Sequence, residues 1–295
     1  MLPCYHVDII VMELQQSGLY AEYIKQLGWK IITLDNVNIF IKHIPLYGNL
    51  AKIQRPSIMP TISKLVKLLK HHRVKTLAME PVQTLNQLEY SRWVTKVKLH
   101  VKINRYPFIP SKTIIVDLKS TEDEIFKRFS EAKRRAVRRA MKNNLLIQES
   151  TNINDLIKIK NKSSGLFGFI TTYGIDKMWK LFSPKHASIL LAYSSSGMTH
   201  DTCNISHLTG GVLLIFWGKV SYYWVAGATK KGKKLFAPTL LVWEALKIAK
   251  KRGATSFDFV GVYDERLPVY SKDWKGFTKF KEGFGGREVW YPIAR

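Results

Sequence analysis

The sequence predicts a protein of the α/β (α+β) class. Its two related halves each carry a mixed sheet flanked by helices. The chain has 295 residues with 46% hydrophobic content, enough for two modest domains with substantial cores. Residues 61–80 and 240–260 share one pattern: an amphipathic helix with a basic end, a short turn, and a strand that carries a carboxylate. This internal repeat indicates two related α/β halves.

A pair of prolines, Pro107 and Pro110, marks the boundary between the halves. We expect an N-terminal domain over residues 1–110, a C-terminal domain over residues 111–284, and a terminal strand over 285–295 that returns to the first domain. Hydrophobic periodicity predicts, in the first half, a helix over 15–29, strands over 30–34 and 37–44, a helix over 61–72 and a strand over 74–79. In the second half it predicts strands over 113–118, 187–193, 211–217, 220–226 and 254–260, a mostly helical stretch over 156–182 and a helix over 240–251.

The best-defined helix is expected as one continuous element from Thr121 to Lys142. Thr121 and Glu124 form a capping box at its start. Between Lys127 and Lys142 it carries eight basic residues and one acidic residue, Glu131. Because like charges four residues apart repel each other, such a face indicates contact with a polyphosphate. A basic face that is merely solvated stays open as the alternative.

The formal net charge is +25, from 47 Lys and Arg against 22 Asp and Glu. This excess favours polyanionic partners such as nucleic acid, phosphorylated substrates or an anionic membrane surface, although many solvated lysines without a specific role are the alternative. The loop Thr229–Lys234, which precedes a helix that opens at Pro238, is an expected anion site. Two cysteines suit a reducing compartment, the N-terminus lacks a secretory signal pattern, and the strongest apolar run, 211–217, is too short to span a bilayer. We expect a soluble cytoplasmic protein, with peripheral contact at the inner face of the membrane as a further expectation.

One lysine near the end of the chain, Lys281, follows Phe280 and precedes a glycine cluster over residues 283–286. Aromatic neighbours remove water from an amine and thereby strengthen its electrostatic effect. The glycines allow a sharp turn of the backbone. Lys281 is therefore a candidate catalytic cation. In the competing interpretation Phe280 belongs to the core and Lys281 extends to solvent.

Several other kinds of chemistry lack their sequence patterns. The eight histidines show no metal-ligand spacing, and the chain has no Cys–His pair, no Gly-x-Ser-x-Gly elbow and no Walker loop. Metal-dependent, serine-hydrolase and NTPase activities are therefore disfavoured. We expect neither a metal nor a cofactor.

A series of segments in the second half resembles, in order, the Fem-type (FemAB and FemX) peptidoglycan bridge-forming aminoacyltransferases, which include lipid II:glycine glycyltransferase. These segments are Tyr222–Ala228, Ala237-Pro238, the helix through 243–245, Phe257–Gly261 and Phe280–Gly285. The basic segment Lys133–Ala140 and the opening helix Gln16–Trp29 are also similar to that family. The resemblance therefore covers nearly the whole chain.

The resemblance implies two tandem GNAT-like acyltransferase domains. It also implies transfer of an amino acid of the Gly, Ala or Ser class from aminoacyl-tRNA to the stem peptide of a peptidoglycan precursor, either lipid II or UDP-MurNAc-pentapeptide. Such a step belongs to cell wall biogenesis and cell shape. Lys281 would be the catalytic cation, and Phe280 would exclude water. The expected substrate-binding residues are Lys25, Glu80, Arg134, Arg138, Lys177 and Tyr223, where Lys177 is the candidate substitute for a phosphate-binding arginine that has no counterpart here.

Two other functions remain as alternatives. One is an acetyl-CoA-dependent GNAT N-acyltransferase that acts on a small amine. Against it, the segment Thr229–Phe236 has one glycine and four lysines, which does not suit close backbone wrapping of a pyrophosphate. The other is a nonenzymatic RNA-binding protein, which the charge favours but which leaves Phe280-Lys281 and the internal repeat unexplained.

Overall fold

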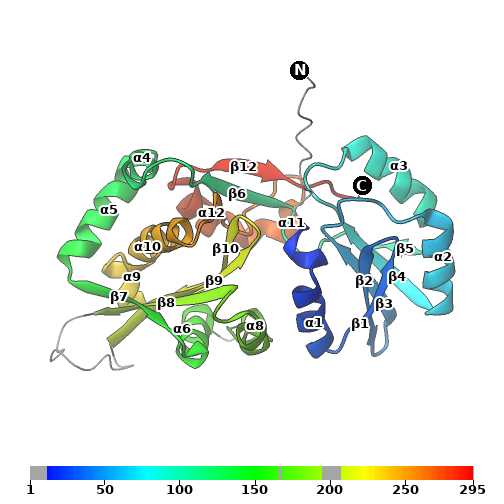
Figure 1. The fold of residues 1–295 in the computed structure, drawn as a ribbon, viewed down its shortest axis with the longest axis horizontal. Helices are drawn as coiled ribbons and strands as arrows, with labels where there is room; N and C mark the ends of the chain where they lie inside the picture. The colour runs from blue at the N-terminus through cyan, green and yellow to red at the C-terminus, as the bar shows by residue number, and fades with distance from the viewer. Residues whose placement is uncertain (1–11, 166–167, 195–206, 295) are drawn as a thin grey trace, which may run out of the picture.

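The computed structural model describes residues 12–165, 168–194 and 207–294, and arranges them around two separate mixed sheets (Figure 1). Within these ranges the first sheet has five strands in the order β1-β2-β3-β4-β5. The second has seven, in the order β12-β6-β11-β10-β9-β8-β7. The division of the two sheets falls between Ile103 and Lys112, while the domain limits themselves stay a prediction.

The first unit is built on an antiparallel β1-β2-β3 meander extended by parallel β4 and β5. Its elements are η1 (Leu14–Gln16), α1 (Gly18–Gln26), β1 (Lys30–Leu34), β2 (Val37–Ile44), β3 (Gly48–Gln54), α2 (Ile62–His71), β4 (Val74–Glu80), α3 (Gln87–Lys98) and β5 (Lys102–Ile103). The turn between β1 and β2 holds Asp35 and Asn36 at positive φ, which matches the twist of a tight hairpin. Leu65 of α2 and Tyr90 of α3 are buried in one core with Ile39 of the sheet.

The second unit has helices on both faces of its sheet. Its elements are β6 (Lys112–Asp117), α4 (Glu122–Lys127), α5 (Glu131–Lys142), β7 (Leu145–Ser150), α6 (Ile153–Ser164), α7 (Gly168–Thr171), α8 (Ile175–Phe182), β8 (Ala187–Ser194), β9 (Leu208–Trp217), β10 (Val220–Ala228), α9 (Lys230–Lys234), α10 (Ala237–Lys251), β11 (Ser256–Asp258), α11 (Pro268–Ser271), η4 (Lys272–Trp274), α12 (Lys275–Glu282) and β12 (Arg287–Trp290). The second sheet has a hydrophobic core on each face, and alternate residues of β9 point into one or the other. Val212 and Leu214 pack with α10, whereas Leu213 and Ile215 pack with α6 and α8. No helix in the described ranges is both long and apolar enough to cross a membrane.

The internal repeat expected from the sequence corresponds to one β-α-β unit in each sheet. β3, α2 and β4 form the first, and β10, α10 and β11 form the second; in both, the two strands pair in parallel. Glu80 and Asp258 occupy the last position of β4 and β11. The repeat therefore places a buried carboxylate at the carboxyl end of the second strand of each unit.

Two helix predictions need correction. The helix expected from Thr121 to Lys142 is divided into α4 and α5, because Ser130 caps a new helix and its N–H donates to the carbonyl of Gly283 at 2.9 Å. The lysine-rich segment expected as a loop contains the short helix α9, because the Thr229 hydroxyl accepts the N–H of Gly232 at 2.9 Å.

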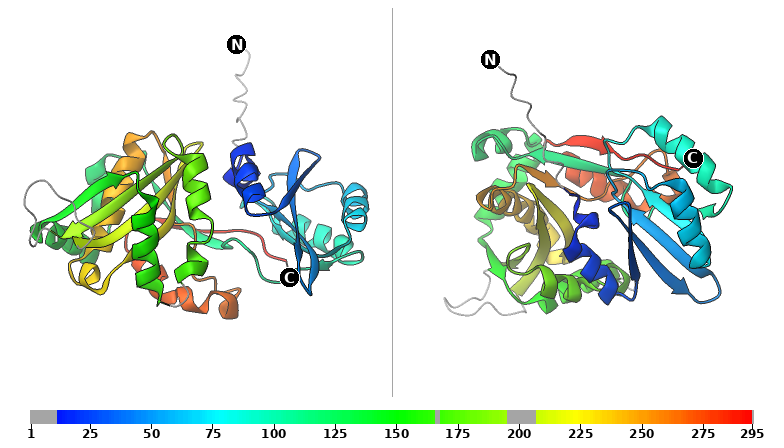
Figure 2. Two further views of the ribbon diagram at one scale, coloured as in Figure 1. Left: turned by 90° about the horizontal axis from the view of Figure 1, so that it is seen from below. Right: turned by 45° about the vertical axis from the view of Figure 1, so that its right-hand side comes forward.

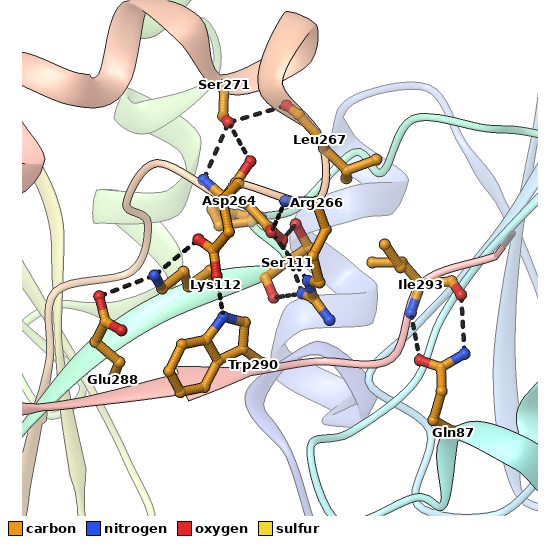
Figure 3. A network of polar contacts seen from close by, with 12 residues as sticks. Gln87, Ser111, Lys112, Asp264, Arg266, Leu267, Ser271, Glu288, Trp290 and Ile293 are labelled. Atoms are coloured by element: carbon orange, nitrogen blue, oxygen red, sulfur yellow. Dashed lines mark hydrogen bonds and ion pairs between the residues drawn. The ribbon is translucent and has the colours of Figure 1, made fainter.

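The C-terminal segment connects the two units, as Figure 3 shows. β12, expected to return to the first domain, pairs instead with β6 of the second sheet. The Lys112 amine bonds the carboxylates of Glu265 at 2.9 Å and Glu288 at 2.8 Å, which fixes this edge. Beyond β12 the chain does reach the first unit, where Ile293 exchanges two 3.2 Å backbone-to-amide hydrogen bonds with Gln87 of α3.

Helix α1 lies on the side of the first unit that faces the second unit (Figures 1 and 2). Tyr20 and Ile24 of α1 are buried in one cluster with Ile175 and Met178 of α8. The contact between α1 and α8 thus forms part of a continuous core across the boundary between the two units. This boundary is called the seam below.

Candidate active site

A cavity opens where β10 and β11 separate. These strands pair only over residues 220–222 and 256–258; β11 then ends, while β10 continues to Ala228 with a register shift between Tyr223 and Val225. Ligands in α/β sheets bind beyond the carboxyl ends of parallel strands, where neighbouring strands diverge. The cavity measures about 450 Å³ and is lined by residues of α6, β10, α10 and α12.

Lys281 of α12 closes one side of this cavity. It is 9% exposed, and its amine donates to the carbonyls of Phe259 at 2.7 Å and Gly261 at 2.6 Å. Val260, between these two carbonyls, has a φ of +69°, a conformation that is costly for a β-branched residue. Such strain is typical of functional sites. A lysine ammonium has three N–H donors, so two hold Lys281 in place and one is left for a ligand.

The electrostatics of Lys281 follow from burial and from Asp258. Burial lowers the pKa of Lys281 to about 7, against the opposing effect of Asp258. Asp258 is itself buried, which raises its pKa, and it accepts from the Thr113 hydroxyl and, at 2.6 Å, from the Val260 N–H. The ring of Phe277 lies 5.0 Å from the Lys281 amine. Near neutral pH the amine therefore has both protonated and neutral forms.

Phe280 and Tyr223 line the same cavity, so the structure brings three of the sequence-predicted site residues together. The Phe280 ring packs at 5.2 Å on Phe284 and carries the Lys133 amine 3.8 Å above its centroid. Burial lowers the pKa of Lys133 to about 8. Burial also raises the pKa of Tyr223, which keeps its hydroxyl neutral. Lys133 is a site neighbour that sequence reasoning had placed only on the basic helix.

A second cavity of about 450 Å³ adjoins the first and shares Ser163, Ala228 and Lys233 with it. Lysines of α6 and of the α9 segment line the two cavities: Lys160, Lys162, Lys230, Lys231 and Lys233. Among the described residues neither lining contains an acidic side chain. The arrangement suits an extended polyanion whose end reaches Lys281. The sequence indicated the α9 lysines as an anion site, but not Lys160, because only the packing of α6 on β10 brings it there.

The comparison with known families bears on this same part of the chain. Residues 196–291 match the model of the FemAB family, and this segment holds β10, α9, α10, β11 and α12. This part of the chain is similar to the FemAB family. The resemblance expected from the sequence is thereby confirmed.

Solved structures show the fold. The crystal structure of FemX superposes with a TM-score of 0.70 at 15% identity, covering 96% of this chain and 91% of FemX. L-PGS from Bacillus licheniformis gives 0.50 at 12% identity, covering 95% and 90%. A tandem GNAT protein from the clavulanic acid biosynthesis pathway also gives 0.50, at 10% identity, covering 86% and 77%. The predicted fold, two tandem GNAT-like domains, is confirmed. No curated protein matches the sequence.

Lys25 and Lys177 form a separate pair at the seam between α1 and α8. The Lys25 side chain is 69% exposed, with its amine 3.6 Å from Glu22. The Lys177 amine donates to the carbonyl of Gln26 at 2.7 Å. The structure thus brings these two predicted substrate-binding residues to one end of α1. Neither of them lines the Lys281 cavity.

Arg134 and Arg138 lie on α5, outside both cavities. The Arg134 guanidinium donates to the carbonyls of Lys127, at 2.9 Å, and Phe129, so it caps the end of α4. Arg138 is exposed, with its guanidinium 5.8 Å from the Phe126 ring. A substrate contact of these arginines stays a prediction, and Arg138 is the one whose charge faces solvent.

Glu80 is buried at the seam and makes contacts within the chain. Its carboxylate accepts from the Gln54 amide at 2.9 Å and from the backbone N–H groups of Phe108 and Ile109. Burial raises its pKa. Glu80 therefore anchors the linker between the two sheets, and its expected substrate-binding role stays a prediction.

Arg55 is a residue of the seam that sequence reasoning missed. It is buried, with a φ of +52°, and donates to the carbonyls of Pro81 at 3.2 Å and Pro110 at 2.6 Å. Its guanidinium carbon lies 3.3 Å from the centroid of the Tyr291 ring. Its charge lowers the pKa of both Glu80 and Asp258, against the larger effect of burial. The only sequence signal was a charged residue before a proline at the end of a short apolar strand.

Gly227 sets how closely α6 approaches β10. A Cβ at this position would lie 2.9 Å from both the Lys160 Cα and the Ser163 Oγ. We expect Gly227→Ala to lower the free energy of unfolding by about 1–3 kcal/mol, because α6 must shift. Gly276→Ala is the control, since a Cβ there meets nothing within 4 Å. Urea unfolding of both variants measures this, and equal stability of the two would show that α6 is not fixed by Gly227.

Proposed function

We propose that this chain is an aminoacyltransferase that moves an amino acid of the Gly, Ala or Ser class from aminoacyl-tRNA to the stem peptide of a peptidoglycan precursor, forming the interpeptide bridge. The observation that carries the proposal is the buried Lys281 amine, held by two backbone carbonyls at the end of a cavity bordered by lysines. The Fem-type match over residues 196–291 supports it.

The reaction needs a cation where Lys281 lies. The amine of the acceptor attacks the ester carbonyl of the aminoacyl-tRNA, a C–N bond forms, and negative charge develops on the carbonyl oxygen. The bond to the ribose oxygen then breaks, and the proton lost by the amine ends on that oxygen. A preorganised donor in a site from which water is excluded stabilises such an oxyanion more than a donor in water does. The free N–H of Lys281 is that donor, and Phe277 and Phe280 exclude water around it.

The two substrates occupy different parts of the molecule. The acceptor end of the tRNA lies along the lysines of α6 and α9, which lead to Lys281. The precursor carries its phosphates to Lys25 and Lys177 at the seam. Both substrates are polyanions, in agreement with the net charge of +25.

Lys160 and Lys233 provide a test of the tRNA path. The double variant Lys160→Gln, Lys233→Gln should raise KM for aminoacyl-tRNA. The slope of log affinity against log salt should become shallower by about 1–2, because each substitution removes one cation that neutralises a phosphate. Lys219→Gln is the matched control, because Lys219 is an exposed lysine in the β9–β10 turn, at the other end of the same strand pair. An unchanged salt slope in the double variant would contradict this path.

The function itself is tested by the product. The purified protein, given a mixture of charged tRNAs and UDP-linked pentapeptide, should yield a stem peptide whose mass has grown by one amino acid residue. The mass increment names the amino acid. A product formed from acetyl-CoA and a small amine, with no extended stem peptide, would favour the acetyltransferase instead.

A further inference from the structure

Two large side chains protrude from the turn between β2 and β3. Leu46 is fully exposed and Tyr47 is 81% exposed. The turn is ordered by the Tyr47 N–H, which donates to the carbonyl of Ile44 at 3.1 Å. Leu46 has a φ of +68°, a left-handed conformation that is unfavourable for leucine. Exposed apolar side chains on a strained, ordered turn gain nothing within the folded chain, which points to an external apolar partner.

Basic residues surround this turn. Lys70 lies in the last turn of α2, and Arg73 and Lys75 follow the helix; all three are exposed. The Asn49 amide, two residues after Tyr47, donates to the carbonyl of His72 at 2.7 Å. The Lys75 side chain lies against the turn, because a Cβ on Gly48 would lie 2.9 Å from its Cγ.

Acidic residues are absent from the stretch of chain that forms this turn and its basic neighbours. The sequence has no Asp or Glu between Asp35 and Glu80. Asp35 lies in the opposite turn, between β1 and β2, where it binds Lys64 at 2.7 Å. Glu80 is buried at the far end of β4. The positive charge beside Leu46 is therefore not neutralised by the carboxylates that flank this region in the sequence.

We propose that Leu46 and Tyr47, with Lys70, Arg73 and Lys75, form a hairpin-tip surface that docks on an anionic lipid bilayer. Basic side chains are attracted to the negative surface potential of such a bilayer, and apolar side chains enter the boundary between headgroups and acyl chains. Tyrosine is favoured at this depth, because its ring is apolar and its hydroxyl is polar. A nucleic acid would also attract the lysines, but its phosphate backbone offers no apolar phase for Leu46.

The hairpin-tip surface lies at the same end of the molecule as the seam between α1 and α8. Lys42, four residues before Leu46, donates its amine to the carbonyl of Leu27 at 2.8 Å, directly after α1. The neighbouring carbonyl, that of Gln26, accepts from Lys177. In Figure 1 the end of α1 and the start of β1 lie together along the lower edge of the molecule. One consequence rests on the proposed function: docking presents Lys25 and Lys177 to a precursor that is anchored in the bilayer.

Vesicle sedimentation tests the docking. The full chain should bind phosphatidylcholine vesicles that contain phosphatidylglycerol, and bind pure phosphatidylcholine vesicles much more weakly. The double variant Leu46→Ser, Tyr47→Ser should lose about tenfold or more in affinity, since the apolar contact is removed. The triple variant Lys70→Gln, Arg73→Gln, Lys75→Gln should lose the preference for phosphatidylglycerol. Val269→Ser, at another side chain that is 79% exposed, should bind as the wild type does.

Three outcomes would overturn the proposal. The first is that the wild type does not bind anionic vesicles, and the second is that the Leu46→Ser, Tyr47→Ser variant binds them as well as the wild type does. The third is that this variant loses RNA binding but keeps vesicle binding. The proposed function is tested separately, with the UDP-linked acceptor, which needs no bilayer. The serine variant should keep the wild-type rate on that acceptor and lose rate only on a lipid-linked acceptor in vesicles. Absent transfer to the UDP-linked acceptor with intact vesicle binding would reject the function and leave the docking standing.

Discussion

Lys281→Met should reduce turnover of aminoacyl-tRNA by a factor of about 10²–10³, as expected when one preorganised donor to an oxyanion is removed. The carbonyls of Phe259 and Gly261 lose their donor in this variant. The fold should nevertheless persist, because the amine that is removed is buried in surroundings that disfavour its ionised form. Single-turnover transfer, with circular dichroism and tRNA binding as measures of folding, tests this. Lys279→Met, two residues away on the exposed side of α12, is the matched control. Retained turnover in Lys281→Met would remove Lys281 from the mechanism.

The pH dependence separates a cationic role of Lys281 from a basic one. With its pKa lowered to about 7 by burial, the amine loses its charge as pH rises through neutrality. Arginine at this position keeps its charge, so the ratio of kcat/KM for wild type to that for Lys281→Arg cancels the titration of the acceptor amine. This ratio should fall as pH rises through about 7 if Lys281 acts as a cation. A rising ratio would identify Lys281 as a general base instead.

The same pKa can be verified without substrate. Between about pH 7 and pH 10.5 the unfolded chain holds a proton on Lys281 that the folded chain has released. The unfolded state then binds more protons, so the free energy of unfolding rises with pH across this window. Lys281→Met lacks this contribution. The stability of wild type relative to Lys281→Met should therefore increase from neutral to alkaline pH in urea unfolding.

Arg55→Met should lower the free energy of unfolding by about 3 kcal/mol at pH 7, because it leaves buried carboxylates without their compensating charge. The carbonyls of Pro81 and Pro110 also lose a donor, and the stacking on Tyr291 changes. Without Arg55, the pKa values of Glu80 and Asp258 should rise further above their ordinary 4.5 and 3.8.

The sign of the pH effect identifies the cause of the Arg55 defect. Near pH 4 the folded variant keeps these carboxyl groups protonated, so the missing charge matters less there than at pH 7. The destabilisation should therefore shrink toward acid. Urea unfolding at both pH values measures it, with the exposed Arg92→Met of α3 as control. An equal loss at both pH values would mean that Arg55 acts through packing alone.

Short sequence patterns correctly predicted the elements whose structure depends on residues that are neighbours in the chain. The strands at Lys30–Leu34 and Val37–Ile44 have the expected bounds, because Asp35 and Asn36 adopt the positive φ values that a tight turn requires. The β-α-β repeat was visible since it recurs along the chain. The division of the basic helix was not, because Ser130 is held by Gly283, more than a hundred residues away.

The same distinction holds for the candidate site: residues with a recognisable local pattern were predicted, and residues placed by packing were missed. Phe280 and Lys281 are adjacent in the sequence, so their pattern was recognisable, and the strand ending in Asp258 precedes them closely. Lys160 and Arg55 were missed because only the packing of α6 on β10, and of β3 on the linker, brings them to the cavity and the seam. A basic residue in a helix or before a proline carries no sign of such a contact in the sequence alone.

Transfer of a labelled amino acid tests the central claim most directly. Aminoacyl-tRNA carrying a radiolabelled amino acid, incubated with the protein and UDP-linked pentapeptide, should lose its label to the stem peptide, and prior ribonuclease treatment of the tRNA should abolish the transfer. Acetyl-CoA in place of the tRNA should give no acylated product. Label that remains on the tRNA across the whole Gly, Ala and Ser set, together with acetyl transfer to a small amine, would contradict the account.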